Sequence, residues 1–331
     1  MVSRRTFLKA GGAALGAAAL GGALARAQTA TSPAAASHVH GFNDVVGPLR
    51  VDDFDPYAFL TQFNRGDTVT NLGAGRARRE WRIVAYNRDL EIAPNVSFPA
   101  WTFNGQVPGP TLRAREGDMV SIAFQNASPH PHTMHFHGIH AAEMDGVPGI
   151  GPGEIKPGGK FTYEFEAKPH GVHLYHCHAL PLKRHVHKGL YGAYVVDPPD
   201  GWGEPAREMV MAMNAFDTDG DGENEVYAVN TKAFAYARKP IQVKRGELQR
   251  VFLVNVTEFD PLNSFHLHAN FFRYREIGHT SNAWRFTDNV HLIQAERGLL
   301  EFTFDMPGRY MFQAHQSEFT ELGWMGFFEV S

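Results

Sequence analysis

From about Glu80 onward, the chain consists of short segments in which hydrophobic residues alternate with polar ones or run together for a few positions. Residues 79–95, 160–168 and 192–198 are examples, and Gly, Pro and Asn separate such segments. No long segment shows the 3.6-residue period of an amphipathic helix. Short strands at this spacing are typical of β-sandwiches, so the pattern predicts an all-β protein.

The second half of the chain repeats the first. Three segments recur in the same order: 110–126 resembles 240–255, 134–138 resembles 265–269, and 171–179 resembles 308–316. Ordered self-similarity of this kind indicates one structural unit that was duplicated and then diverged. A turn-rich break at 197–205 separates the copies. We therefore predict two sandwich domains, 79–200 and 201–331.

The N-terminal region has a different character. Residues 1–27 contain Arg4 and Arg5, then a run of Ala, Gly and Leu, and end in Ala25-Arg26-Ala27. This order is typical of a twin-arginine export signal cut after Ala27, so we expect a periplasmic or otherwise exported protein. Residues 28–78 are expected to form a linker and an N-terminal extension. No later segment approaches the length of a membrane span, so none is expected in the mature chain.

The charge balance narrows the classes of partner. The chain has a formal net charge of −4, and loss of the four positive charges in residues 1–27 would make it more acidic still. Affinity for nucleic acid depends on Lys and Arg, so we expect no nucleic-acid partner.

The chain contains 18 histidines but only one cysteine, Cys177. Exported proteins usually pair their cysteines, so a lone one indicates chemistry rather than a disulfide. Cys177 lies between His176 and His178. Because alternate residues of a strand share a face, the two histidines should point one way and the thiol the other. One strand could then serve two sites.

The ligand types around the thiol indicate copper. A thiolate, two imidazoles and a weak axial group form the blue electron-transfer site. We predict that Cys177, His132 and His185 supply these ligands, with Leu190 in the axial direction. His187 is the rival of His185. Zinc also accepts Cys and His, but one cysteine among many paired histidines fits zinc poorly.

An acidic segment at 217–225 resembles a calcium-binding loop at first sight. The twelfth position counted from Asp217 is Ala228, where such a loop requires Glu. A glycine-rich hairpin loop with solvated carboxylates is the better interpretation.

Four motifs together resemble a known family: "HTMHFHG", "YHCH", "NGQVPGPTLRAREGD" and "MDGVPGI". The chain resembles the multicopper oxidases, in particular the two-domain, laccase-like branch with type 1 copper in the first domain. The resemblance implies two cupredoxin-like Greek-key domains in a homotrimer. It also implies up to four coppers per subunit, three of them in a cluster between domain 1 of one subunit and domain 2 of its neighbour.

The resemblance also implies roles for individual residues. Asp145 corresponds to an acidic residue that supplies protons near the cluster. The implied copper ligands are His135 and His266 for type 2, and His137, His176, His178, His268 and His315 for type 3.

One position departs from the family pattern. The second domain should carry a second His-x-His pair, yet Gln313 stands where a histidine is expected, aligned with His176. The cluster then has seven imidazoles instead of eight. A glutamine oxygen is a weaker and harder donor for copper. Gln313 itself, or His291, could complete the cluster.

The family chemistry is one-electron oxidation of a phenolic, aromatic or metal-ion reductant at type 1 copper, coupled to four-electron reduction of O₂ to water at the cluster. A copper nitrite reductase is one alternative, but that family has an Asp where this chain has His135 and an axial Met where it has Leu190. A periplasmic copper-binding protein with an impaired cluster is the other.

Overall fold

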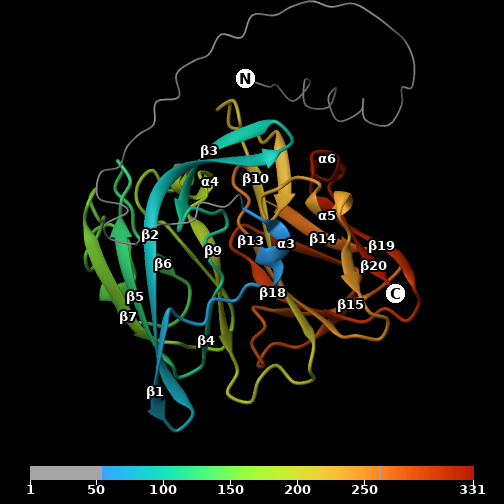
Figure 1. Cartoon of the computed structure of the whole chain (residues 1–331), viewed down its shortest axis with the longest axis horizontal. Coiled ribbons are helices and arrows are strands. Elements are labelled where there is room, and N and C mark those ends of the chain that lie inside the picture. Colours follow the sequence, from blue (N-terminus) through green and yellow to red (C-terminus); the bar gives the residue numbers. More distant parts are fainter. Residues whose placement is uncertain (1–53, 261) are drawn as a thin grey trace, which may run out of the picture.

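The computed structural model describes residues 54–260 and 262–331 (Figure 1), so the predicted signal at 1–27 lies outside the described residues. Strands dominate and helices are short. Strands of the first half of the chain, cyan to green, lie beside those of the second half, yellow to red. The predicted all-β, two-domain cupredoxin-like fold is confirmed.

The first sandwich pairs a five-stranded sheet with a four-stranded one. The larger sheet has the order β1-β2-β5-β7, with β3 paired to β2, and the smaller one has the order β4-β9-β8-β6. The strands are β1 (Thr68–Gly73), β2 (Arg76–Ala93), β3 (Val96–Phe103), β4 (Leu112–Arg115), β5 (Met119–Asn126), β6 (His135–Phe136), β7 (Lys160–Glu166), β8 (Gly171–His176) and β9 (Tyr191–Asp197). β1 comes from the segment that the sequence assigned to the extension.

The second sandwich has sheets of the orders β11-β10-β13-β18-β15-β16 and β12-β20-β19-β14-β17. Its strands are β10 (Arg207–Phe216), β11 (Val226–Val229), β12 (Ile241–Val243), β13 (Gln249–Asn255), β14 (Leu262–Leu267), β15 (Phe272–Glu276), β16 (Arg285–Thr287), β17 (Asn289–Ile293), β18 (Arg297–Phe302), β19 (Gly308–Gln313) and β20 (Met325–Val330).

The strand order confirms the internal repeat. In the first sandwich β2 runs parallel to β5, and β5 pairs antiparallel with β7. In the second, β10, β13 and β18 reproduce this arrangement. The smaller sheet matches as well, because β4-β9-β8-β6 corresponds to β12-β20-β19-β14.

The helices are short: α3 (Pro56–Thr61), the 3₁₀ turn η2 (Ala142–Met144), α4 (Leu182–His187), α5 (Ala235–Arg238) and α6 (Ser317–Glu321). In α3, the Asp55 carboxylate caps the N-terminus by accepting the Tyr57 N–H, and Phe59 and Leu60 are buried. None of the helices in the described residues is long and apolar enough to cross a membrane.

Three hydrophobic clusters show how the four sheets stack. One lies inside the first sandwich, one inside the second, and one between the two sandwiches. Strand β10 illustrates the arrangement, because Met209 and Met211 face the second sandwich's core while Val210 and Ala212 face the cluster between the domains. The sheets containing β8 and β10 therefore pack against each other, and the sheet containing β14 lies on the far side of the second sandwich.

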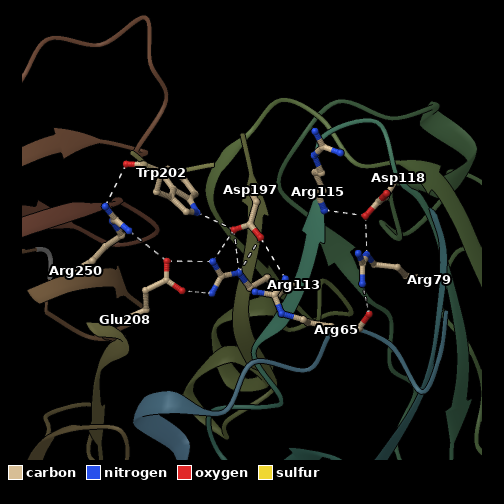
Figure 2. Close-up of polar contacts among 9 residues, drawn as sticks. All are labelled: Arg65, Arg79, Arg113, Arg115, Asp118, Asp197, Trp202, Glu208 and Arg250. Atoms are coloured by element: carbon tan, nitrogen blue, oxygen red, sulfur yellow. Dashed lines mark hydrogen bonds and ion pairs between the residues drawn. The ribbon is translucent and has the colours of Figure 1, made fainter. Parts of the chain in front are cut away.

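An ion-pair network joins the two sandwiches where the chain passes from one to the other (Figure 2). The Arg113 guanidinium on β4 is 4% exposed and pairs with Asp197 at 2.8 Å and Glu208 at 2.5 Å. The Trp202 indole donates to Asp197, and Arg250 pairs with Glu208 and donates to the Trp202 carbonyl. Buried charges require such partners. The network therefore helps to fix the position of the second sandwich relative to the first.

Candidate metal centre

The structure brings His132, Cys177 and His185 together in the first sandwich. The Cys177 Sγ lies 3.2 Å from His185 Nδ1 and 3.8 Å from His132 Nδ1. The two Nδ1 atoms are 3.2 Å apart. All three residues are buried, so one thiol and two imidazoles converge on a single point away from solvent.

The surrounding backbone holds this group in place. The Thr133 N–H points at the Cys177 Sγ at 3.3 Å, and Ser128 Oγ bonds the outer nitrogen, Nε2, of His132 at 2.7 Å. These contacts leave the His132 Nδ1 directed at the thiol. Sequence reasoning missed Ser128 and Thr133, because a hydroxyl or an N–H beside a ligand has no spacing signature.

His185 and Leu190 are positioned by α4 and the turn that follows it. The Leu190 carbonyl accepts the Cys177 N–H at 2.9 Å, which ties the helix exit to the end of β8. Leu190 is fully buried in the same core cluster as the thiol. The rival, His187, lies outside the group, and its Nε2 accepts the Asp217 N–H at 3.0 Å.

Burial sets the protonation of the group. It lowers the pKa of His132 to about 3 and that of His185 to about 4, so both imidazoles are neutral at pH 7 and present free lone pairs. Burial also raises the pKa of the Cys177 thiol to about 11. A cation that binds here must therefore displace the thiol proton, as metal binding to cysteine generally does.

Four histidines occupy the opposite face of the same sheet. The ring nitrogens of His135, His137 and His176 lie within 4.8 Å of one another, and the His178 ring is 5.4 Å from that of His135. Along β8 and the residues that follow it, Leu174, His176 and His178 line one cavity, whereas Cys177 faces the core of the first sandwich. The predicted alternation of histidines and thiol is therefore confirmed.

Two aspartates support equivalent histidines in the two sandwiches. The His135 Nδ1–H donates to the Asp145 carbonyl at 2.9 Å, and the Asp145 carboxylate lies 3.1 Å away. The His266 Nδ1–H donates to the Asp288 carbonyl at 2.9 Å. Each bond fixes the tautomer and turns Nε2 outward. Asp288 was missed because it lies 22 residues from His266 and only folding joins them.

Gly146 explains why Asp145 can lie so close to His135. Its φ is +69°, and an added Cβ would lie 2.0 Å from the Met134 carbonyl oxygen. Only glycine fits this approach without displacing the backbone.

A second histidine group lies in β14 and just beyond the ends of β14 and β19. The His266 ring is 4.6 Å from that of His268 and 5.2 Å from that of His315. Gln313 pairs with His266 across the sheet, so it shares their face as the sequence alignment implied. His291 pairs with Ser264, which places it on the same face but one register step away from His266.

The two histidine groups are far apart within one chain. His135 and His176 face the cluster between the domains, whereas His266 lies on the outer face of the sheet beyond the second core, since Phe265 and Leu267 fill that core. Two sheet spacings of about 10 Å each lie between these positions. A cavity of about 290 Å³ meets the first group and one of about 870 Å³ the second, with no lining residue in common.

Two buried nitrogens among these histidines have no hydrogen-bond partner in the described part of the chain: His178 Nδ1 and His268 Nε2. A buried polar atom without a partner is costly. A metal ion would satisfy such atoms, and neutral imidazoles suit copper. The residues present therefore fit the metal that the thiol and histidines predict.

Comparison with known proteins agrees with this chemistry. Models of the multicopper oxidase family match residues 86–201 and 204–331. The chain therefore belongs to the multicopper oxidase family, which supports copper binding.

Individual relatives include both oxidases and reductases. The chain is 30% identical to a copper-containing nitrite reductase of Neisseria meningitidis over 258 residues, 71% of this chain and 64% of that protein, so it spans about 64% of this relative's length. It is 41% identical to the L-ascorbate oxidase of Cucumis sativus over 43% of this chain and 24% of that protein. A crystal structure of a multicopper oxidase matches with TM-score 0.81 and 54% identity, covering 84% of this chain and 97% of that one.

Proposed function

We propose that the protein is a laccase-like multicopper oxidase that couples one-electron oxidation of a small phenolic, aromatic or metal-ion reductant to four-electron reduction of O₂ to water. The observation that carries this proposal is the short covalent path from Cys177 to His176 and His178. The thiol belongs to one candidate site, and its two neighbours line the cavity of another. One strand would thereby connect the site that accepts electrons from the reductant to the site that passes them to O₂.

Bound copper would supply the one-electron chemistry at both sites. Cys177, His132 and His185 would hold type 1 copper, with the Leu190 side chain in the axial direction. His135 and His266 would hold type 2 copper, and the type 3 pair would have His137, His176, His178, His268 and His315 as ligands, with Gln313 or His291 beside them. Asp145 would hold the proton on His135 Nδ1 and carry protons towards the cluster from the adjoining cavity of about 620 Å³.

We further propose that the two histidine groups meet between chains in a homotrimer, because two sheets and a core separate them within one chain. Co-expression of His137→Ala with His268→Ala tests this. Each contact between neighbouring chains needs an intact first histidine group from one chain and an intact second group from the other. With random mixing about a quarter of these contacts have both, so about a quarter of wild-type O₂ turnover should return. Each variant alone should be inactive. If the mixture is also inactive, the groups do not meet between chains.

The proposed activity is tested on the copper-loaded protein. It should consume O₂ with a phenol, and it should show blue absorption and the near-ultraviolet band of a type 3 pair. Consumption of nitrite without O₂ uptake would favour nitrite reduction. Copper binding with neither activity would favour a copper-binding role.

Nitrite reduction is the second candidate because Gln313 weakens the type 3 pair and several relatives are named copper-containing nitrite reductases. The histidines at positions 135, 178 and 268 argue against it, since a single type 2 copper has no use for all of them.

The remaining features of the proposal come from the sequence. Residues 1–27 would direct export through the twin-arginine pathway to the periplasm and then be removed. Residues 79–200 and 201–331 would form the two domains, and the partners would be O₂, a small reductant and further copies of the chain.

A further inference from the structure

The loop that joins β10 to β11 differs from the solvated hairpin that the sequence predicts. Four of its carboxylate residues, Asp217, Asp219, Asp221 and Glu225, each place an oxygen within 4.8 Å of the others. Asp217 is only 6% exposed and Glu225 only 1%. Four acidic groups therefore converge at a point that is buried on the side of Asp217 and Glu225, while Asp219 is half-buried and Asp221 is exposed.

Glu225 supplies an independent indication of a ligand at this point. Its Oε2 accepts the Thr218 N–H at 2.6 Å and the Thr218 hydroxyl at 2.9 Å. Its Oε1 is fully buried and has no hydrogen-bond partner in the described part of the chain. A buried carboxylate oxygen without a donor is costly unless a cation faces it.

Among residues 54–260 and 262–331, no Lys or Arg forms an ion pair with any of the four carboxylates. Burial, together with the charges of Asp219 and Asp217, raises the pKa of Glu225. The fold therefore gathers acidic side chains here with no Lys or Arg in ion-pair contact among the described residues, and Lys188 interacts with Asp217 only beyond that distance.

We propose that this loop binds one calcium ion through Asp217, Asp219, Asp221 and Glu225. Calcium prefers flexible sets of carboxylate oxygens, and calcium loops place ligands at positions 1, 3, 5 and 9 with glycine at position 6. The four carboxylates occupy those positions and Gly222 the sixth. Position 12 is Ala228 and supplies no carboxylate, so the buried carboxylate of the group is Glu225 at position 9, directly before β11.

The proposed calcium loop is hydrogen-bonded to α4, the helix that carries one residue of the candidate thiol–histidine site. The Asp217 N–H donates to His187 Nε2 at 3.0 Å, and His187 lies two residues from His185. The His187 ring also packs on Phe259 at 4.9 Å. An ion that orders Asp217 would therefore stabilise the helix that carries one of the predicted copper ligands, without contacting the copper.

Titration of the copper-loaded, full-length protein with CaCl₂ after removal of adventitious divalent ions tests the proposal. Calorimetry should give one site per chain, with a Kd on the order of 10⁻⁵ to 10⁻³ M. Saturation should raise Tm by a few degrees, about the size expected for ligand-linked stabilisation. MgCl₂ should bind at least about tenfold more weakly, because Mg²⁺ demands stricter geometry.

Two variants make the test specific. Glu225→Gln should weaken calcium binding by about tenfold or more, because it removes the charge of the partnerless oxygen. Glu223→Gln removes a carboxylate from the same loop but outside the group, so it should leave affinity nearly unchanged. If Glu225→Gln does not fold, Asp219→Asn, on the less buried side, should show the same loss.

Three results would overturn the proposal. The first is no heat and no shift in Tm at about 10 mM CaCl₂, well above the expected Kd. The second is equal affinity for magnesium. The third is equal weakening by Glu225→Gln and Glu223→Gln, which would indicate diffuse attraction to an acidic loop.

Discussion

The two sandwiches share a backbone frame of matching hydrogen bonds, but the side chains that this frame holds differ at one site. In the first, the Cys177 N–H donates to the Leu190 carbonyl and the Leu190 N–H to the His185 carbonyl. In the second, the Ala314 N–H donates to the Trp324 carbonyl and the Trp324 N–H to the Phe319 carbonyl. Ala314, Phe319 and Trp324 therefore occupy the places of Cys177, His185 and Leu190.

The comparison teaches that the frame does not depend on metal ligands. Trp324 is fully buried, and Phe319 stacks on Tyr227 with a centroid distance of 4.0 Å, so aromatic volume fills the space where the first sandwich has its ligands. Protein interiors are close-packed, so side chains must fill this space whether or not they can bind a metal. The side chains at these three positions, together with His132, therefore distinguish the candidate metal site from a closed core.

The largest effect should come from Cys177→Ser. Loss of the thiolate should abolish the blue absorption and lower O₂ turnover at least about 100-fold, because a hydroxyl is a poor ligand for copper in this site. Absorbance spectroscopy and an oxygen electrode measure the two effects.

Ala314→Ser is the matched control, since it places the same hydroxyl at the equivalent buried position. It should cost about 1–3 kcal/mol of stability through an unpaired polar group while the colour persists. A Cys177→Ser protein that stays blue would contradict the assignment of the thiol.

His315→Ala should separate the two candidate sites. O₂ turnover and the near-ultraviolet band should fall on the order of 10- to 100-fold, because a cluster ligand is lost. The blue absorption should persist, since His315 lies in the second sandwich, far from Cys177. Loss of both signals together would mean that the sites are not independent.

Arg113→Ala should test how far the two sandwiches depend on each other. It leaves Asp197 and Glu208 without their partner, and breaking a buried pair typically costs about 3–5 kcal/mol. Chemical denaturation measures the free energy of unfolding. As a control, Arg309→Ala removes an exposed pair with Glu329 and should cost less than about 1 kcal/mol.

Gln313→His should restore the repeat at the position aligned with His176. The added imidazole should raise copper content and increase O₂ turnover by about two- to tenfold, because nitrogen is the better donor for copper. Unchanged copper content would show that Gln313 or His291 already completes the cluster.

The smallest effect should come from Leu190→Met. A thioether in the axial direction stabilises the oxidised ion, so the type 1 reduction potential should fall by tens of millivolts, with about 59 mV equal to a tenfold change in the one-electron equilibrium. Redox titration of the blue band measures it. Leu190→Ile adds no donor and should move the potential less.

The sequence predicted the features that leave a local pattern. Alternation along "LYHCHA" predicted which way Cys177 and His176 point, and the repeat aligned Gln313 with His176, a correspondence that the strand pairing bears out, since Gln313 pairs with His266 as His176 pairs with His135. The orphaned nitrogen of His268 and the support of His266 by Asp288 depend on contacts between distant segments, which no spacing encodes.

The acidic loop shows a different limit. A rule that asks for Glu at the twelfth position counted from Asp217 rejects calcium, because it assumes the geometry of one loop type. Glu225 lies directly before β11, and the fold there brings its carboxyl group beside the three aspartates of the loop. Burial of its Oε1 is a tertiary property, and the sequence could not show it.

The most direct test is diffraction from crystals of the copper-loaded protein at the copper absorption edge. One copper should lie among Cys177, His132 and His185, and further coppers should lie where His176 and His178 of one chain approach the His268 and His315 positions of another. An empty thiol site, or metal held by each histidine group alone with no second chain against it, would contradict the account.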